Sequence, residues 1–199
     1  KMSYRSDIYT KLGPNMTDQP IILVSATPNA PTGCLNFVTT RFERSIDCAL
    51  GRSGIGVKQS EGDGVTPVGT FILREIWYRP DRVSKDTEIS QAQLPLRVIT
   101  QNDGWSDDPN DPDYNKHVEL PHGFGHECLW REDNQYDIII VVGFNDAPVQ
   151  VGLGSAIFFH LSKPDLGPTE GCIAIPRDEM LALISHLRFG QRISFSLKT

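Results

Sequence analysis

The sequence predicts a mainly β fold of mixed strands, with one helix packed near the C-terminus. Short β-favouring runs separated by turn residues fill the N-terminal half. Two almost wholly apolar runs follow at residues 136–144 and 155–159, which is typical of strands covered on both faces. The segment from Pro176 to Gly190 has the spacing of a helix. No break in composition divides the chain, so we expect a single domain over residues 1–199.

The first expected strand is Ile21 to Val24. A hairpin follows, in which Cys34 to Thr39 pairs with Ile46 to Leu50. That register places Cys34 opposite Cys48. In an oxidising compartment facing cysteines could form a disulfide, whereas an offset pairing would leave two ordinary buried thiols, and the sequence leaves both alternatives open.

Two glycine-rich segments interrupt the strands. Gly51 to Lys58 allows a phosphate-loop interpretation, because glycine lets backbone amides approach an anion. It lacks the Gly-Lys-Ser/Thr ending and a following helix, so we predict a bend between strands. Gly62 to Gly69 is a second turn-rich loop that leads into a strand at Thr70 to Leu73. Residues 79–115 predict an irregular excursion able to shape a groove.

The C-terminal elements have clearer patterns. Tyr136 to Phe144 predicts a central strand, and Ser155 to Phe159 a second one that ends at His160. Pro176 stands near the first turn of the helix, with acidic residues after it and Gly190 beyond its end. The apolar positions of that helix are Met180, Leu183, Ile184 and Leu187. A last strand is expected from Arg192 to Leu197.

Composition and charge narrow the classes of function. The formal charge of −6 has no basic clusters, so we do not expect nucleic acid as a partner. The longest apolar run, Ile138 to Val142, is too short to cross a bilayer, and we expect no membrane span. The first residues, Lys1 to Tyr4, contain no signal peptide. The four cysteines lack any Cys-x-x-Cys spacing for zinc or redox chemistry.

A histidine and a cysteine that lie close in sequence are the candidate catalytic pair. His160 follows an apolar run, and Cys172 comes after a loop rich in proline and glycine. A thiol attacks carbonyls as the thiolate, which a neighbouring histidine favours by taking the proton. Gly171 lets the backbone approach a substrate and direct amide groups at an oxyanion. The alternative is a buried apolar thiol beside a structural histidine, and spacing alone leaves it open.

The context of this pair resembles a known signature. Ala156-Ile157-Phe158-Phe159-His160, followed by Thr169-Glu170-Gly171-Cys172-Ile173, is similar to the L,D-transpeptidase catalytic domain, the YkuD family. That signature is a histidine at a strand end, a spacer, and then Ser/Thr, a variable or His position, Gly and the nucleophilic Cys. The segment Gly62 to Gly69 with Thr70 and Phe71 resembles the family's Thr-Pro-x-Gly-x-Phe segment. The similarity covers roughly residues 50–197.

The resemblance implies a mixed β-sandwich fold and a cysteine acyltransferase that cross-links peptidoglycan. Cys172 would be the acylated nucleophile, His160 the general base, and the backbone around Gly171 and Cys172 the oxyanion hole, while Thr169 would shape the loop. The partners would be donor and acceptor stem peptides, and a carbapenem could acylate the cysteine because it mimics the donor. No cofactor and no metal is implied. The substrate places the protein in the periplasm or cell envelope.

Three departures from the family concern substrate binding. Glu170 replaces the usual His, Ala174 replaces an Arg usually found two residues after the Cys, and the spacer of 11 residues is short. A guanidinium binds a carboxylate through two hydrogen bonds, which alanine cannot do, so we expect a different recognition of the stem and an unusual acceptor such as the L-Ala amine. Candidate substrate-binding residues are therefore Thr169, Glu170, Arg131 with its neighbour Trp130, and Arg79.

Three rival hypotheses accompany the transpeptidase. Water could resolve the same thioester, which would make the protein an L,D-carboxypeptidase. The chain could instead be a non-catalytic peptidoglycan-binding module, although the presence of both His160 and Cys172 argues against this. The third is a zinc site at His122 to Glu127, which holds two imidazoles and a carboxylate. The two glycines of this segment argue against a helix that presents both histidines on one face.

Overall fold

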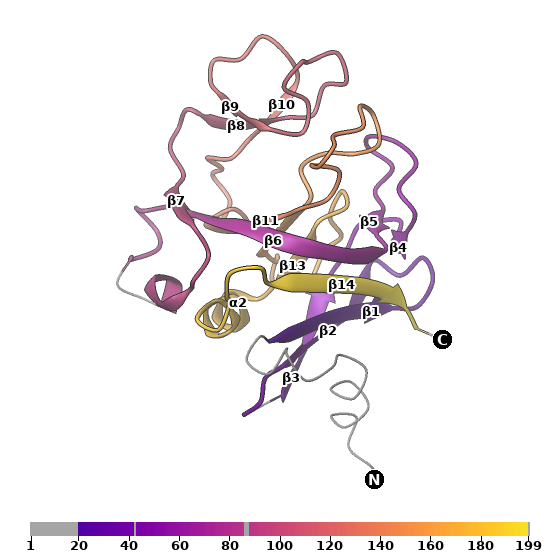
Figure 1. Ribbon diagram of the computed structural model, residues 1–199, viewed down its shortest axis with the longest axis vertical. Helices are drawn as coiled ribbons and strands as arrows, with labels where there is room; N and C mark the ends of the chain where they lie inside the picture. The colour runs from indigo at the N-terminus through magenta and orange to yellow at the C-terminus, as the bar shows by residue number, and fades with distance from the viewer. Residues whose placement is uncertain (1–19, 42, 86–87, 199) are drawn as a thin grey trace.

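The computed structural model describes residues 20–41, 43–85 and 88–198. It is mainly β, with one α-helix near the C-terminus, as predicted (Figure 1). The expectation about the first four residues lies outside the described ranges. No helix within those ranges is long and apolar enough to cross a membrane.

One nine-stranded sheet forms the body of the molecule. Its strands in chain order are β1 (Ile21–Ala26), β2 (Thr32–Val38), β3 (Glu43–Ala49), β6 (Gly69–Tyr78), β7 (Leu96–Val98), β11 (Ile138–Val142), β12 (Phe158–Leu161), β13 (Ile173–Ile175) and β14 (Arg192–Leu197). Their order in the sheet is β11-β12-β13-β3-β2-β1-β14-β6-β7. Parallel pairs, such as β1 with β14, occur beside antiparallel ones, which makes the sheet mixed.

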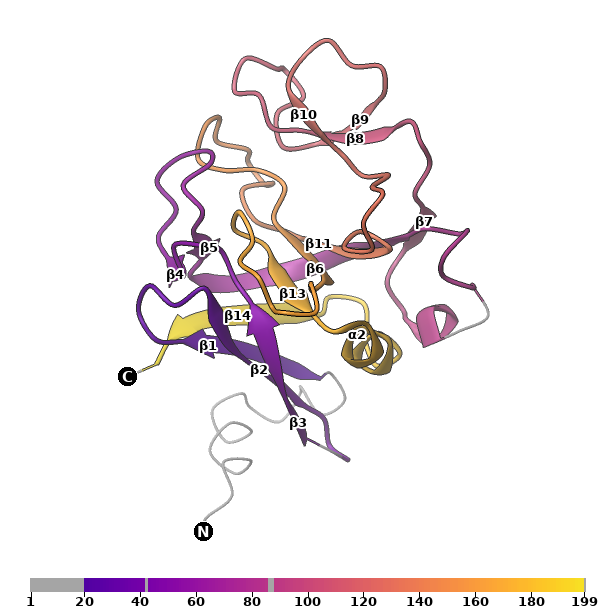
Figure 2. The same ribbon diagram turned by 180° about the vertical axis from the view of Figure 1, so that it is seen from behind.

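The remaining elements are short. Two parallel strands, β4 (Ile55–Gly56) and β5 (Thr66–Pro67), join the two glycine-rich segments. A three-stranded sheet consists of β8 (Asp103–Ser106), β9 (His117–Glu119) and β10 (His126–Cys128), in the order β10-β8-β9. We call it the small sheet. It lies at the top of Figure 1, above β6 and β11, and Figure 2 shows it far from β1–β3.

The hairpin of β2 and β3 is confirmed, but its predicted register is wrong by one residue. Cys34 pairs with Asp47, and Cys48 pairs with Gly33. Because successive residues of a strand point to opposite faces, this offset puts the two cysteines on opposite sides of the sheet. Both thiols are free, so the disulfide alternative is excluded and the buried Cys48 is an ordinary core residue.

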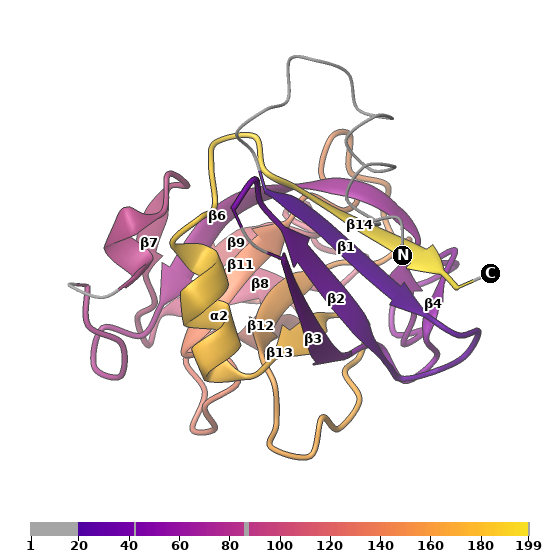
Figure 3. The same cartoon turned by 90° about the horizontal axis from the view of Figure 1, so that it is seen from below.

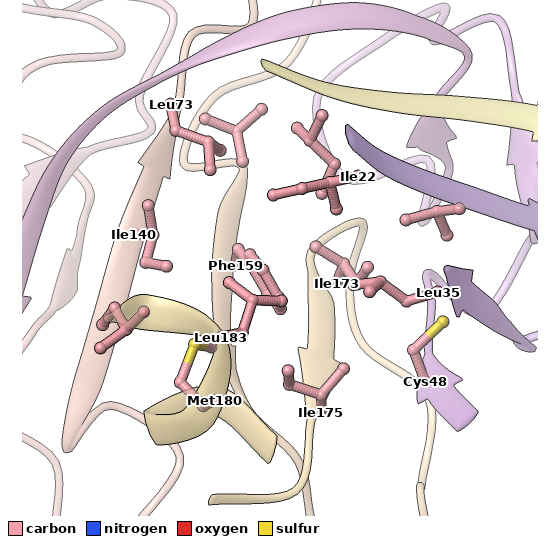
Figure 4. Close-up of a cluster of buried hydrophobic side chains, with 14 of the residues drawn as sticks. Ile22, Leu35, Cys48, Leu73, Ile140, Phe159, Ile173, Ile175, Met180 and Leu183 are labelled. Carbon is pink, nitrogen blue, oxygen red and sulfur yellow. The ribbon is translucent and has the colours of Figure 1, made fainter. Parts of the chain in front are cut away.

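The large sheet curls until its first strand in sheet order, β11, also pairs with β6. An aliphatic core fills the space enclosed by the curled sheet. Figure 4 shows side chains from β1, β2, β6, β11, β12 and β13 meeting there. β1 shows how the sequence produces this arrangement, because every second residue, Ile22, Val24 and Ala26, is buried while its neighbours are partly exposed.

Strands β11, β12 and β13 are buried on both faces, as the two apolar runs predicted for β11 and β12. Their inner face joins the aliphatic core, whereas the outer face belongs to a second cluster that includes Phe158, Tyr136 and Cys172. Trp105 of the small sheet meets Phe158 edge-on, with ring centroids 5.3 Å apart. The small sheet therefore covers the outer face of the body beside Cys172.

Several element boundaries differ from the prediction, and two of them bear on the site. The strand expected at Ser155 to Phe159 begins at Phe158 and includes His160, because Ala156 adopts a positive φ of 51° that extended backbone cannot continue. The helix α2 spans only Arg177–Ile184, with Pro176 as its N-cap. The excursion of residues 79–115 contains a 3-10 turn, η1 (Glu88–Gln91), together with β7 and β8.

The helix closes one end of the core. Met180, Leu183 and Ile184 are its buried residues, and they lie in the aliphatic core. Figure 3 shows α2 running beside β12 and β13, and Figure 4 places Met180 and Leu183 next to Phe159 and Ile175. This packing fixes the inner side of β12 and β13, whose outer side carries the candidate catalytic residues.

Candidate active site

A cavity of about 530 Å³ opens between the small sheet, β12 and the loop that precedes β13. Cys172 and His160 both line it. They come from two adjacent parallel strands, since β12 holds His160 and Cys172 directly precedes β13. The structure thus brings the predicted pair to one cavity. Its other lining residues include Lys58, Glu61, Asp107, Glu127, Arg131, Tyr136, Ser155, Ala156, Lys163, Thr169 and Glu170.

Two backbone groups hold the Cys172 thiol. Its Sγ atom accepts a hydrogen bond from the Phe158 amide at 3.3 Å and donates one to the Ala156 carbonyl at 3.3 Å. Ala156 is the residue with positive φ, and its own amide donates to Asn115 at 3.1 Å. A strained backbone residue maintained by its surroundings is typical of functional sites. Here the strain turns a carbonyl toward the thiol.

The His160 ring is oriented by backbone and by an aromatic neighbour. Nδ1 lies 2.9 Å from the Leu161 carbonyl. Because a carbonyl can only accept, Nδ1 carries the proton of the neutral ring and Nε2 is the basic nitrogen. Tyr136 meets the ring edge-on, with centroids 5.1 Å apart. Within the described ranges, no hydrogen bond joins His160 to Cys172 Sγ.

The pair is neutral at rest. Burial, and then the charge of Glu127, raise the pKa of the Cys172 thiol to about 12, against the smaller opposing effects of the Phe158 amide and Lys58. Burial lowers the pKa of His160 to about 4. Both shifts disfavour the charged form, as expected for groups removed from water. An ion pair of thiolate and imidazolium is therefore disfavoured in the site as it stands.

The loop Thr169–Cys172 is fastened to the segment that follows β3. The Thr169 amide donates to the Leu50 carbonyl at 2.9 Å, and the Arg52 amide donates to the Thr169 carbonyl at 2.8 Å. Inside the loop, Thr169 Oγ1 donates to the Cys172 carbonyl at 2.7 Å and accepts from the Gly171 amide at 3.2 Å. Thr169 thus shapes the loop because its hydroxyl group both donates and accepts a hydrogen bond within it.

Gly171 is required by its backbone conformation and by close packing. Its φ is +137°, in the region that favours glycine. A Cβ atom there would lie 3.0 Å from the Val65 carbonyl and 3.3 Å from Ile157 Cδ1. Both glycine-rich segments lie beside Gly171 and Cys172. The Gly51 amide of the first segment donates to Thr66 Oγ1 of the second at 2.8 Å, and the fully buried Thr66 contacts the Cys172 carbonyl.

Two of the three departures from the family, Glu170 and Ala174, have structural counterparts. Glu170 forms an ion pair with Arg52, and both side chains are largely exposed. Ala174 lies in β13, pairs with His160 across the sheet and is 1% exposed. A small buried residue therefore stands where the family has a guanidinium.

The structure separates the three other predicted substrate-binding residues. Arg131 lines the cavity, with its guanidinium 4.8 Å from the Tyr136 ring centre and hydrogen-bonded to Asp133 at 3.0 and 2.6 Å. Arg79 and Trp130 do not line it. Arg79 is 3% exposed and stacks over the Trp130 ring at 3.4 Å. It also donates to the Arg131 carbonyl at 2.7 Å, so it supports Arg131 from behind.

Several residues that line the cavity were not among the predicted site residues. Tyr136 was assigned to a strand and Glu127 to a rival metal site, yet the Tyr136 hydroxyl donates to Glu127 Oε1 at 2.5 Å beside His160. Lys58, Glu61 and Asp107 also line the cavity. Their only sequence signal was a location in polar, glycine-rich or irregular segments.

The histidines of residues 122–127 have other partners. His122 Nε2 lies 2.6 Å from Asp111, and His126 Nδ1 lies 2.8 Å from the Phe124 carbonyl. Across the described part of the chain, no group of three or more His, Cys, Asp or Glu side chains is placed to hold a metal ion.

Comparison with protein families gives one match over most of the chain. The model of the L,D-transpeptidase catalytic domain, YkuD, matches residues 36–194. This range contains both glycine-rich segments, His160 and Cys172. Among curated proteins, none matches the sequence.

Solved structures with a similar fold belong to larger proteins. The helical cell shape determining protein Pgp2 of Campylobacter jejuni is 12% identical to this chain, with a TM-score of 0.44. The match covers 98% of this chain and 56% of that protein. L,D-transpeptidase 1 of Mycobacterium tuberculosis is 12% identical to this chain, with a TM-score of 0.37. The match covers 90% of this chain and 63% of that protein. The chain thus spans less than two thirds of either relative.

Proposed function

Because the chain belongs to the L,D-transpeptidase catalytic domain family, we propose that it is a peptidoglycan L,D-transpeptidase with Cys172 as its nucleophile. The observation that carries the proposal is that Cys172 and His160 line one cavity on adjacent parallel strands. The fastening of the Thr169–Cys172 loop supports it, because that loop holds the sulfur in one position. The proposed location is the periplasm or cell envelope, where peptidoglycan lies.

The proposed reaction has two acyl transfers. In the first, the thiol proton passes to His160 Nε2 while sulfur attacks the carbonyl of the third residue in a donor tetrapeptide stem. Backbone amides around Gly171 and Cys172 would stabilise the oxyanion. The C–N bond then breaks and D-Ala leaves with the proton from His160. In the second transfer an amine of another stem attacks the thioester, a new C–N bond forms and the thiol is regenerated.

The neutral resting state has a role in this scheme. A thiol with a pKa of about 12 is almost entirely protonated at neutral pH and reacts slowly with stray electrophiles. A donor that fills the cavity would bring His160 and the thiol into proton-transfer contact. Arg131, which lines the cavity, is the proposed partner for a carboxylate of the stem, since position 174 is a buried alanine.

Purified tetrapeptide muropeptides test the proposal. We expect intact-mass spectrometry to detect a thioester on Cys172 and chromatography to detect cross-linked dimers, with the cross-link identifying the acceptor amine. Cys172→Ala should abolish both, and His160→Gln should slow acylation by about 10²- to 10⁴-fold. Cys128→Ala is the matched control, because Cys128 is an exposed free thiol.

The rival functions give different products in the same experiment. Trimmed tripeptide monomers without dimers would indicate an L,D-carboxypeptidase. Binding to sacculi without a thioester would indicate a non-catalytic module and would refute the proposal. A carbapenem should add its mass to the wild-type protein and not to Cys172→Ala.

A further inference from the structure

Glu127 is a carboxylate of the small sheet that lines the same cavity as the proposed nucleophile. It belongs to β10 and lines the cavity with Cys172. Its Oε1 atom accepts the 2.5 Å hydrogen bond from Tyr136, whose ring in turn contacts His160. Within the described ranges, Oε2 accepts no hydrogen bond, and 27% of the side chain is exposed. One carboxylate oxygen is thus fixed by Tyr136 while the other remains available to a ligand.

Of the three cations that line the cavity, Lys58 and Arg131 have partners of their own, and among the described residues no ion pair joins the third, Lys163, to Glu127. Lys58 pairs with Asp63 at 2.7 Å, and Arg131 forms two hydrogen bonds to Asp133. The closest approach of Arg131 to Glu127 is 3.9 Å, a distance too long for a hydrogen bond. The ion pair of Glu127 with Arg131 is therefore a loose one, and among the described residues no cation forms a hydrogen bond to Glu127.

Two further carboxylates line the same cavity. Glu61 accepts hydrogen bonds from Ser155 and Tyr114, and Asp107 lies in the loop after β8. Burial, together with the charges of the neighbouring carboxylates, raises the pKa of Glu127 and of Asp107. Like charges that share a site disfavour each other's ionised forms and favour an incoming cation or proton. The acidic part of the cavity lining formed by Glu61, Asp107 and Glu127 is therefore suited to a positively charged ligand.

We propose that Glu127 binds the ammonium group of the acceptor stem and takes the proton that the amine must lose before it attacks the thioester. This inference rests on the proposed function and assigns its second half-reaction to a residue outside the Cys–His pair. The ammonium would donate to Glu127 Oε2 and pass it one proton, which frees the nitrogen lone pair to attack the thioester carbonyl and form the C–N bond. As the C–S bond breaks, the nitrogen loses its second proton and the sulfur takes it up to regenerate the thiol, while Glu127 releases the first proton to solvent.

The division of labour follows from the two environments. His160 is buried and weakly basic, so it suits a proton that moves only between the sulfur and the leaving amine inside the closed site. Glu127 is partly exposed and binds a proton more readily than an ordinary carboxylate, so it suits a charged group arriving from solvent. Tyr136 contacts both and acts as the positioning residue between them.

Glu127→Gln separates the two half-reactions, because glutamine keeps the size of the side chain and an acceptor for Tyr136 but cannot take a proton. We expect acylation by the tetrapeptide donor within about threefold of wild type. Transfer to a stem amine should fall about 10²- to 10³-fold. Transfer to hydroxylamine, which is uncharged at neutral pH, should stay near the wild-type rate. Glu119→Gln, an exposed change on β9 of the same sheet, is the matched control and should leave all three rates unchanged.

The pH profile gives a readout that a structural role would not change. Wild-type transfer to the amine should hold its rate down to the pKa of Glu127 and decline only below it, whereas the variant depends on free amine and should lose rate steadily below the pKa of the amine. Equal losses in acylation and in both transfers would mean that Glu127 only supports the fold, and normal transfer to the amine would also overturn the inference. A wild-type protein that forms no thioester would refute the proposed function itself, an outcome distinct from acylation without Glu127 dependence.

Discussion

The two parts of the molecule that meet at the Cys172 cavity are held together by different interactions. The body is stabilised by an aliphatic core that fills the curled nine-stranded sheet. The small sheet depends on buried or half-buried polar pairs. Asp111 accepts a hydrogen bond from Ser106 at 2.5 Å and lies 2.6 Å from His122. In a second pair, His117 lies 2.6 Å from Asp103. Trp105 attaches this sheet to the body.

The difference matters for the site because each part supplies one side of it. Cys172 and His160 come from the body, and Glu127 and Asp107 come from the small sheet or its loops. Apolar burial gives a cooperative unit that opens only on global unfolding, whereas a small sheet with few apolar contacts can open locally at lower cost. The nucleophile is thus on the rigid side and the proposed acceptor wall on the side that can move.

The largest expected effect is on the body. Phe159 is fully buried between β11 and β13, so Phe159→Ala removes a ring from the centre of the aliphatic core. We expect a loss of about 3–5 kcal/mol in the free energy of unfolding, measured by urea denaturation at neutral pH. Val98→Ala, an exposed change on β7, should cost less than about 0.5 kcal/mol. Equal losses would show that the aliphatic core is not the main source of stability.

Acid provides the next test, through His160. Its pKa falls from 6.5 to about 4 on burial, so the unfolded chain takes up a proton that the folded protein refuses. The neutral imidazole stabilises the fold above pH 6.5, and this contribution is lost as the pH falls towards 4. We expect about 2–3 kcal/mol less stability at pH 4.5 than at pH 7 from this group. His160→Gln should show a correspondingly smaller difference between the two pH values, and an unchanged difference would contradict the assignment.

The small sheet should respond locally. Asp111→Asn removes the charge that Ser106 and His122 share, and leaves buried polar groups less well satisfied. We expect the amides of β8–β10 to exchange with solvent about tenfold faster, while those of β1 and β2 keep their protection. Uniform acceleration across both sheets would show that they unfold as one unit.

Local patterns predicted the body better than the small sheet. The strand at Arg192 to Leu197 was placed without error, and β11 lies within its predicted run, because alternation and β-branched runs are local signals. The hairpin register was missed by one residue, since the sequence around its turn does not fix which residues pair. Of the small sheet, only β8 lies within the predicted excursion of residues 79–115, and no strand was predicted at β9 or β10, because strands of three or four residues held by polar pairs have no apolar period to detect.

The same contrast divides the candidate site. His160 and Cys172 were found because a sequence signature joins them within 13 positions. Glu127 and Tyr136 were not, because their relation to that pair exists only after the small sheet folds over β11 and β12. Arg79 was proposed to bind substrate, but it is buried, stacks on the Trp130 ring and donates to the Arg131 carbonyl, a difference that depends on burial and not on residue type.

The smallest expected effect concerns the ion pair of Arg52 with Glu170, beside the nucleophile. Both side chains are largely exposed, in contrast to Asp111 in the small sheet. An exposed pair is screened by water and typically contributes less than about 1 kcal/mol. Its removal should also spare the loop, because the Arg52 amide and not its side chain holds Thr169.

A double-mutant cycle with Arg52→Ala and Glu170→Ala measures this contribution. We expect a coupling energy of about 0.2–1 kcal/mol that declines with added salt, and acylation of Cys172 within about threefold of wild type. A coupling energy several times larger would mean that this ion pair, and not the backbone hydrogen bonds to Leu50 and Arg52, positions the nucleophile loop. At the Thr169–Cys172 loop, the body would then depend on a polar pair of side chains, as the small sheet does.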